Sequence, residues 1–113
     1  SLQNTGDRGE TSAQVREKVL KVREIQMERS GKINAYLNSK EIERDCKLSD
    51  KDAFFLENAL NKLGLSVRAY HRILKVSRTI ADLQGEQQIS QPHLAEALGY
   101  RAMDRLLQKL SNM

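Results

Sequence analysis

The sequence predicts an all-α protein, a compact bundle of about five helices. Aromatic residues make up only 4% of the chain and Trp is absent, which disfavours a β-sandwich. Apolar residues recur at helical spacing, and no segment alternates with the two-residue period of a strand. With 113 residues, of which 39% are hydrophobic and 30% charged, the chain has the size and composition of one globular domain.

Helix-start signals locate the first helix. Residues 1–10 are polar and aperiodic, so we expect a flexible N-terminal segment ahead of a helical domain over residues 11–113. Thr11 and Gln14 fit a capping box, and Gly31 is a typical stop, which together predict a helix to about Ser30. An apolar stripe is expected along this helix, formed by Val15, Val19, Val22, Ile25 or Gln26, and Met27.

The middle of the chain is predicted to hold two further helices. Residues 32–38 form an apolar-rich connector, either one turn of helix or an irregular loop. Asn38 and Glu41 offer a second cap, for a short helix through Cys46. Residues 49–64 then carry a serine cap, an apolar stripe and a terminal glycine, which predict a third helix.

The same signals predict two helices in the last part of the chain. Ser66 is an N-cap for a helix over 67–83, which stops before Gly85. The next start follows Ser90, with Pro92 tolerated in the first turn because its missing N–H has no helical partner there. Gly99 is a point at which this helix is expected to kink or divide. Its apolar positions are Leu94, Leu98, Met103, Leu106 or Leu107, and Leu110.

The helix over 67–83 carries the most informative pattern. Its apolar side, expected to be buried, is formed by Tyr70, Ile73, Leu74, Ser77, Ile80 and Ala81. Arg68, Arg72, Lys75 and Arg78 are predicted to lie on the opposite side, with only Asp82 nearby to offset them. Guanidinium groups at one-turn spacing suit phosphate, as a contact with nucleotide or DNA. A solvated helix face is the commoner explanation of such a pattern, so both readings stay open.

The sequence indicates no catalytic or metal site. A phosphate-binding loop is absent, because Gly31-Lys32 is followed by Ile33 without the required upstream glycine. Cys46, His71 and His93 lie far apart in sequence, and nothing specifies a third group that would orient a Cys–His pair. We therefore expect no autonomous catalysis, no metal ligands and no cofactor in this chain.

The bulk charge and cysteine content place the chain in a broad class. Its net charge of +4 is compatible with a polyanion partner, but basic and acidic residues are interleaved as on an ordinary solvated surface. A single cysteine excludes an internal disulfide and suits a reducing compartment. No segment has the length of a membrane span or the pattern of a signal peptide, so the expected location is the cytoplasm, with no membrane partner.

Two segments of the chain resemble a known family. The run GLSVRAYHRILKVSRTIADLQGEQQISQPHLAEALGYRAMDR, residues 64–105, closely resembles the C-terminal domain of the ComM-like, Mg-chelatase-like AAA+ ATPases. The earlier run SAQVREKVLKVREIQMERSGKINAYL, residues 12–37, is similar to the part of that family that joins the ATPase core to the lid. The resemblance thus covers about residues 10–110.

The resemblance implies that the chain is the C-terminal fragment of a longer protein, with an AAA+ lid-like fold. The lid of this family carries the sensor-2 arginine, which reaches the terminal phosphates of the nucleotide, and Arg68 matches that position. ATP and Mg²⁺ are implied only for the full-length protein, whose Walker motifs would lie upstream. The implied partners are the AAA+ core of the same chain and neighbouring subunits of a homo-oligomeric ring, usually a hexamer. Complete family members are implicated in ATP-driven movement on DNA, including branch migration during natural transformation.

Two alternatives compete with a lid of an AAA+ motor. One is a stand-alone DNA-binding module that uses the basic side from Arg68 to Arg78. The other is an oligomerisation module, with subunit contacts made by exposed Leu and Met residues of the last helix.

Overall fold

The computed structural model describes residues 11–111, with side chains described as far as Arg101. Over this range the protein is all-helical, in the order α1 (Ser12–Ser30), η2 (Asn34–Tyr36), α2 (Ser39–Asp45), α3 (Asp50–Leu63), α4 (Val67–Leu83) and α5 (Gln91–Ser111). The predicted fold class is confirmed. The flexible segment predicted over residues 1–10 lies outside the described residues, as do the apolar side chains expected late in α5.

Local capping explains where the helices begin. The Thr11 hydroxyl accepts a hydrogen bond from the Gln14 N–H while the Gln14 side chain accepts one from the Thr11 N–H, and Asn38 and Glu41 do the same for α2. Ser49 starts α3 by accepting a hydrogen bond from the N–H three residues on.

The predicted stops are also confirmed, with one exception in α5. Gly31 and Gly64 end α1 and α3 with φ of 75° and 66°, a left-handed conformation that only glycine adopts without strain. By contrast, Gly99 does not divide its helix, since α5 is continuous from Gln91 to Ser111.

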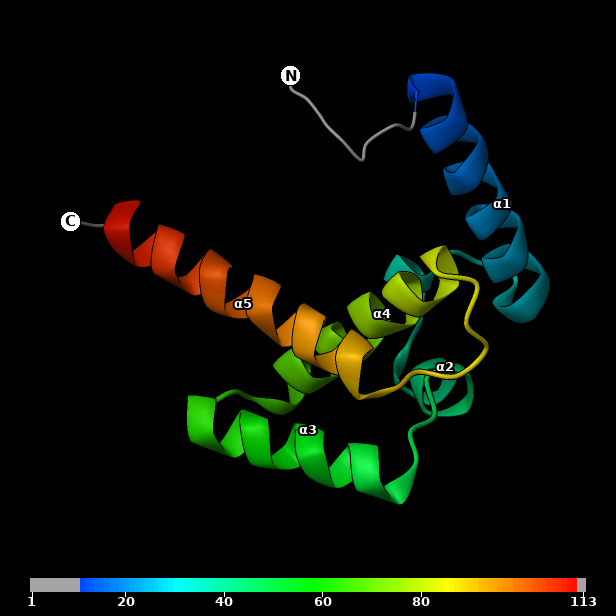
Figure 1. Ribbon diagram of the computed structural model, residues 1–113. Helices are drawn as coiled ribbons and strands as arrows, with labels where there is room; N and C mark the ends of the chain where they lie inside the picture. The colour runs from blue at the N-terminus through cyan, green and yellow to red at the C-terminus, as the bar shows by residue number, and fades with distance from the viewer. Residues whose placement is uncertain (1–10, 112–113) are drawn as a thin grey trace.

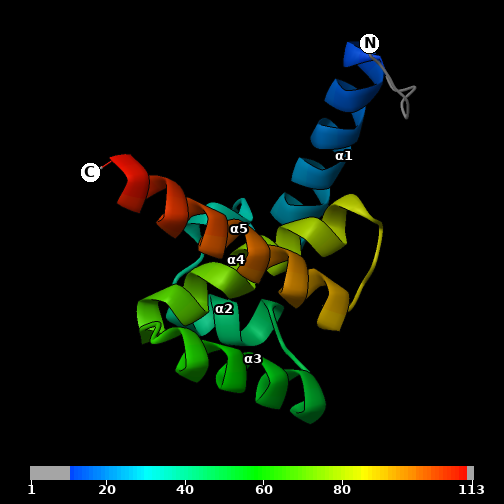
Figure 2. The same cartoon turned by 60° about the vertical axis from the view of Figure 1, so that its left-hand side comes forward.

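Helix α4 is the centre of the bundle. It packs most extensively on α5 and also contacts α1, η2 and α2, while α3 packs on α5 (Figures 1 and 2). The buried face of α4 was predicted correctly, and Leu74 and Ile80 are 4% and 7% exposed. The core around it is formed by Leu37, Ile42, Cys46, Leu56, Leu60, Ile73, Leu74, Ile80, Ile89, Leu94, Ala97 and Leu98.

Helix α1 departs from the prediction. Only Val22 and Gln26 of its expected apolar stripe are buried, whereas Val15 and Val19 are 46% and 43% exposed. The reason is that α1 rises away from the bundle, so its N-terminal half has no described element beneath it (Figures 1 and 2). Ile25 and Met27, also exposed, are each about 100° around the helix from Gln26 and so point elsewhere.

Candidate functional site

The first turn of α4 positions the candidate arginine. The Ser66 hydroxyl accepts a hydrogen bond from the Ala69 N–H at 3.3 Å, which fixes the start of the helix. Arg68 therefore lies in the first turn, where free backbone N–H groups and the helix dipole already favour an anion. Ala69 is 4% exposed and packs against the bundle, so the adjacent arginine side chain is directed outward.

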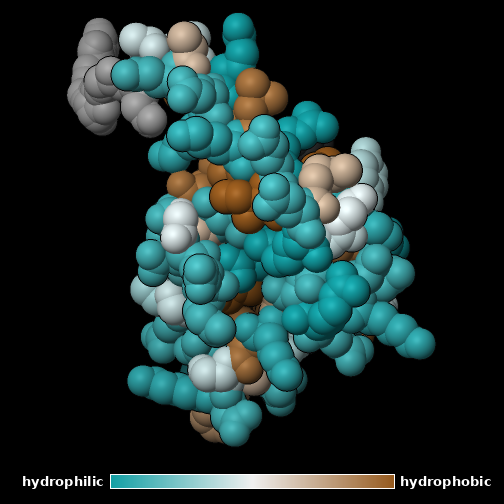
Figure 3. Space-filling view, turned by 90° about the vertical axis from the view of Figure 1, so that its right-hand side faces the viewer, coloured by the Kyte–Doolittle hydropathy of each residue, from teal (hydrophilic) through white to brown (hydrophobic). Residues whose placement is uncertain are grey.

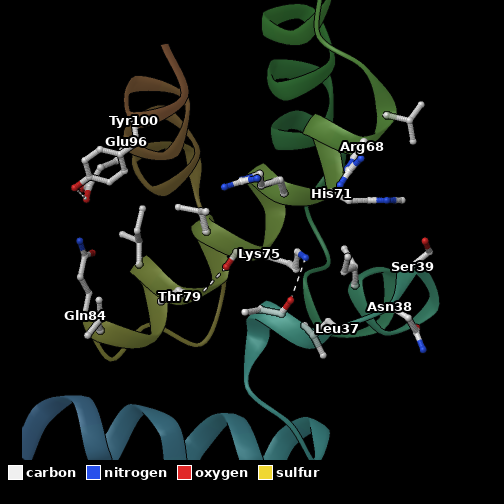
Figure 4. A pocket seen from close by; sticks show the side chains of 17 residues that line it. Leu37, Asn38, Ser39, Arg68, His71, Lys75, Thr79, Gln84, Glu96 and Tyr100 are labelled. Carbon is white, nitrogen blue, oxygen red and sulfur yellow. Dashed lines mark hydrogen bonds between the residues drawn. The ribbon is translucent and has the colours of Figure 1, made fainter. Parts of the chain in front are cut away.

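A groove of about 1220 Å³ runs along the exposed side of α4. Its floor is formed by α4 residues from Val67 to Leu83, and its two sides come from the η2–α2 segment and from α5. Figure 4 shows Arg68, His71, Lys75 and Thr79 of α4 between Leu37, Asn38 and Ser39 on one side and Glu96 and Tyr100 on the other. The groove is basic at the end near Arg68 and more apolar near Leu83.

Arg68 and Arg72 are the two cationic side chains of the groove that have no partner among the described residues. Both side chains are exposed and both line the groove, one helical turn apart. Neither has an ion pair or a side-chain hydrogen bond with any of the residues that the structure describes. Two like charges at this spacing destabilise a helix by roughly 0.2–0.5 kcal/mol. A contribution to stability therefore does not explain why two arginines stand at these positions.

Lys75 uses one of its N–H groups within the protein. Its Nζ donates a hydrogen bond to the backbone carbonyl of Ala35 at 3.3 Å, and Figure 4 shows this bond crossing from α4 to η2. The lysine therefore tethers one side of the groove to its floor. Its remaining N–H groups are available to an anion in the groove.

The structure contradicts the sequence-based prediction for Arg78. Instead of lying on the exposed basic side, it is 4% exposed. Its Nε donates to Asp82 at 3.0 Å, and its two terminal nitrogens donate to the backbone carbonyls of Gln87 and Glu86 at 2.8 and 2.6 Å. With all three nitrogens engaged inside the protein, this guanidinium has a structural role and is not available as a phosphate or DNA contact.

Asp82 is the centre of a buried polar cluster that the sequence did not reveal. Its carboxylate accepts five hydrogen bonds, two from Arg29, one each from Gln26 and Asn34, and one from Arg78. Burial alone would raise the pKa of Asp82, but the hydrogen bonds from Arg29 and the charge of Arg78 outweigh it and lower that pKa. The cluster joins the end of α1, η2 and the end of α4. Its only sequence signal was a lone acid beside several basic residues.

Two other residues with reactive side chains, Cys46 and His93, are buried inside the fold. Cys46 is 2% exposed, and burial raises the pKa of its thiol to about 11, so it is not a nucleophile at neutral pH. His93 is also buried, with 3% of its surface exposed. Its Nδ1 accepts from the Ser90 N–H, which leaves Nε2 to donate to Gln84. Among the described residues, no group of three or more His, Cys, Asp or Glu side chains could hold a metal ion.

A comparison with protein families decides the assignment of the chain. Residues 9–101 match the family described as magnesium chelatase, subunit ChlI C-terminal. The chain belongs to this family. All of α1 to α4 and the groove therefore lie within the matched Mg-chelatase C-terminal domain.

Three curated relatives share this Mg-chelatase C-terminal domain. The chain is 96% identical to the competence protein ComM of Haemophilus influenzae over 113 residues, all of this chain and 22% of that protein. It is 50% identical to a protein named YifB of Escherichia coli over 93% of the chain and 21% of that protein. A YifB of Salmonella typhimurium is 47% identical over 99% of the chain and 22% of its own length. The chain thus spans about a fifth of the length of the relatives it matches.

None of the described helices combines the length and the hydropathy needed to cross a membrane.

Proposed function

We propose that this domain is the helical lid of an AAA+ ATPase and presents Arg68 to the terminal phosphates of ATP bound by a core domain of the same longer chain. The proposal rests on one observation. Arg68 is exposed in the first turn of α4, at the basic end of a groove, and has no described partner. This is the position that the family resemblance assigns to the sensor-2 arginine.

The chemistry of the position fits a phosphate. A guanidinium carries a permanent charge and two parallel N–H donors, so it binds phosphoryl oxygens in a bidentate manner. The free N–H groups of the first turn add favourable partial charge beside it. Charge that develops on a phosphoryl group during transfer would be stabilised by such a fixed donor, which would also report whether that group is present.

The domain alone is expected to be inactive. It supplies one phosphate contact, whereas hydrolysis also requires a phosphate-binding loop, an Mg²⁺ site and a residue that positions water. Its relatives are more than four times longer, which leaves room for a separate core. We expect the 113-residue chain neither to hydrolyse ATP nor to bind it tightly.

The wider role proposed for the full-length protein follows the family resemblance. In this role the full-length protein forms a homo-oligomeric ring that moves on DNA, including branch migration during natural transformation. One relative is named a competence protein, which agrees with this role.

The decisive experiment is substitution of Arg68 in the full-length protein. Arg68→Ala should lower kcat for ATP hydrolysis on the order of 100-fold, because a fixed donor to the reacting group is lost. Arg68→Lys should rescue only part of this loss, because lysine keeps the charge but not the planar fork. Lys62→Ala, an exposed change on α3, is the matched control and should leave kcat unchanged. Full activity in Arg68→Ala would overturn the proposal.

A stand-alone DNA-binding module is less well supported. Arg78 is internal and Lys75 is tethered to Ala35, so only Arg68 and Arg72 of the expected basic side are uncommitted. With two phosphate contacts, the logarithm of the DNA-binding constant should fall against the logarithm of salt concentration with a slope on the order of −2, about half of that expected for four contacts. A titration of the isolated chain against duplex DNA over a range of salt concentrations measures this slope.

A further inference from the structure

The outward side of α1 has a distinctive surface. Glu17, Leu20, Glu24, Met27 and Glu28 fall within about 100° of one another around the helix. All five are exposed, with Leu20 at 56% and Met27 at 51%. Figure 3, which faces the α1 side of the molecule, shows apolar side chains among polar ones over its upper part, where α1 lies.

Two of these acids form an unfavourable pair within their own helix. Glu24 and Glu28 are four residues apart on the exposed side of α1, and neither pairs with a cation among the described residues. Like charges at this spacing destabilise the helix by roughly 0.2–0.5 kcal/mol. A cation brought from elsewhere would remove this cost.

The groove along α4 has the opposite charge and the same spacing. Arg68 and Arg72 are also four residues apart, exposed and without a described partner. Four residues further along the same side of α4 is the half-buried, apolar Val76. The one described acid of the groove, Glu96, accepts a hydrogen bond from Tyr100 at 3.0 Å and forms no ion pair with Arg68 or Arg72.

The two surfaces match when the helices run antiparallel. Each has three positions at successive four-residue intervals, and an α-helix places such positions about 6 Å apart along its axis. Three contacts then form together: Leu20 with Val76, Glu24 with Arg72, and Glu28 with Arg68. The 19 residues of α1 extend about 28 Å and the 17 residues of the groove floor about 25 Å, so one helix spans the other. Antiparallel helices also align their dipoles favourably.

We propose that the outward side of α1 in one copy of this domain docks in the α4 groove of a second copy. Within one copy the contact cannot form, because α1 packs on its own α4 through the opposite side, where Val22 and Gln26 are buried. The two surfaces differ, so each docked copy still offers a free α1 and a free groove. Such head-to-tail contacts close into rings or continue as filaments.

The contact goes beyond the proposed phosphate role of Arg68 and centres on Arg72. It stands even if Arg68 binds no phosphate, because Glu24–Arg72 and Leu20–Val76 do not involve that residue. Where Arg68 does bind phosphate, the interface loses only the pair with Glu28. The experiment below therefore changes neither Arg68 nor Glu28.

The test is self-association of the 113-residue chain measured by sedimentation velocity at low salt. Wild type should form concentration-dependent species beyond a dimer, and high salt should weaken them. Glu24→Arg alone and Arg72→Glu alone should each weaken association at least about tenfold, because each places like charges across the contact. An equimolar mixture of the two variants should associate again, because every α1 then meets a groove of opposite charge.

Two controls separate this contact from general charge effects. Glu57→Arg and Lys62→Glu make the same charge changes at exposed positions on α3 and should associate as wild type does. Circular dichroism should show unchanged helix content in all variants, since the changed side chains are exposed. A wild-type chain that stays monomeric at high concentration, single variants that associate like wild type, or a mixture that fails to associate would each overturn the proposal.

Discussion

The two ends of α4 use the same residue type for opposite purposes. Arg68, in the first turn, is exposed and has no partner among the described residues. Arg78, ten residues later, is 4% exposed and bridges Asp82 and two backbone carbonyls. An arginine whose three nitrogens are all engaged inside the protein holds the fold together, whereas an exposed one with its donors free is available to a ligand.

The difference arises from what surrounds each end of the helix. The C-terminal end lies against the last turn of α1 and the turn before α5, so a guanidinium there is enclosed by acceptors. Asp82 supplies the counter-charge and also receives Arg29 from α1. The N-terminal end opens into the groove instead. The polar cluster thus anchors α1 and α4 together while the opposite end of α4 stays accessible.

The largest effect on stability is expected from breaking the Arg78 cluster. Arg78→Ala should lower the free energy of unfolding by about 3–5 kcal/mol, because it removes one partner of a buried ion pair and leaves two backbone carbonyls without a donor. Urea denaturation followed by circular dichroism measures the change. A variant as stable as wild type would show that the buried pair contributes nothing net.

A smaller, pH-dependent effect should follow from Asp82. Its pKa is lower in the folded protein than in the unfolded chain, so its contribution is fully present above about pH 4 and is lost as the pH falls through the folded pKa. The pKa values of Glu41 and Asp45 are also lowered, by the Asn38 N–H and the Arg44 side chain respectively, so acid weakens more than one group.

The Asp82→Asn variant isolates the contribution of Asp82. Below about pH 4, stability of the wild type should fall more steeply than that of Asp82→Asn, because the variant has no carboxylate to protonate there. Urea midpoints measured between neutral pH and pH 2 give the two slopes. Parallel slopes would remove Asp82 as the source.

The smallest effect on stability is expected at the other end of the helix. Arg68→Ala and Arg72→Ala should each change the free energy of unfolding by no more than about 0.5 kcal/mol, because both side chains are exposed and lack described partners. Relief of their mutual repulsion acts in the stabilising direction in either variant. The same urea measurement applies, and a loss comparable to that of Arg78→Ala would mean that the comparison between the two ends is wrong.

Local chemistry was enough to predict the helices. Ser, Thr and Asn caps act on N–H groups two or three residues away, and glycine stops act through their own backbone, so neither requires the rest of the fold. The buried face of α4 was also predictable, because residues such as Leu74 and Ile80 share a side of the helix by periodicity alone. Arg68 could be singled out for a similar reason, as the arginine that follows a serine cap.

The sequence by itself determined the all-α class, the helix boundaries and which residues share a face, because these depend on contacts within a turn or two of helix. Only the tertiary structure decided what covers each face. It left Val15 and Val19 of α1 exposed, enclosed Arg78 and formed a groove around Arg68 and Arg72. Periodicity cannot determine these outcomes, since the acceptors that enclose Arg78 include the backbone carbonyls of Glu86 and Gln87, in the turn before α5, which meet α4 only in the folded chain.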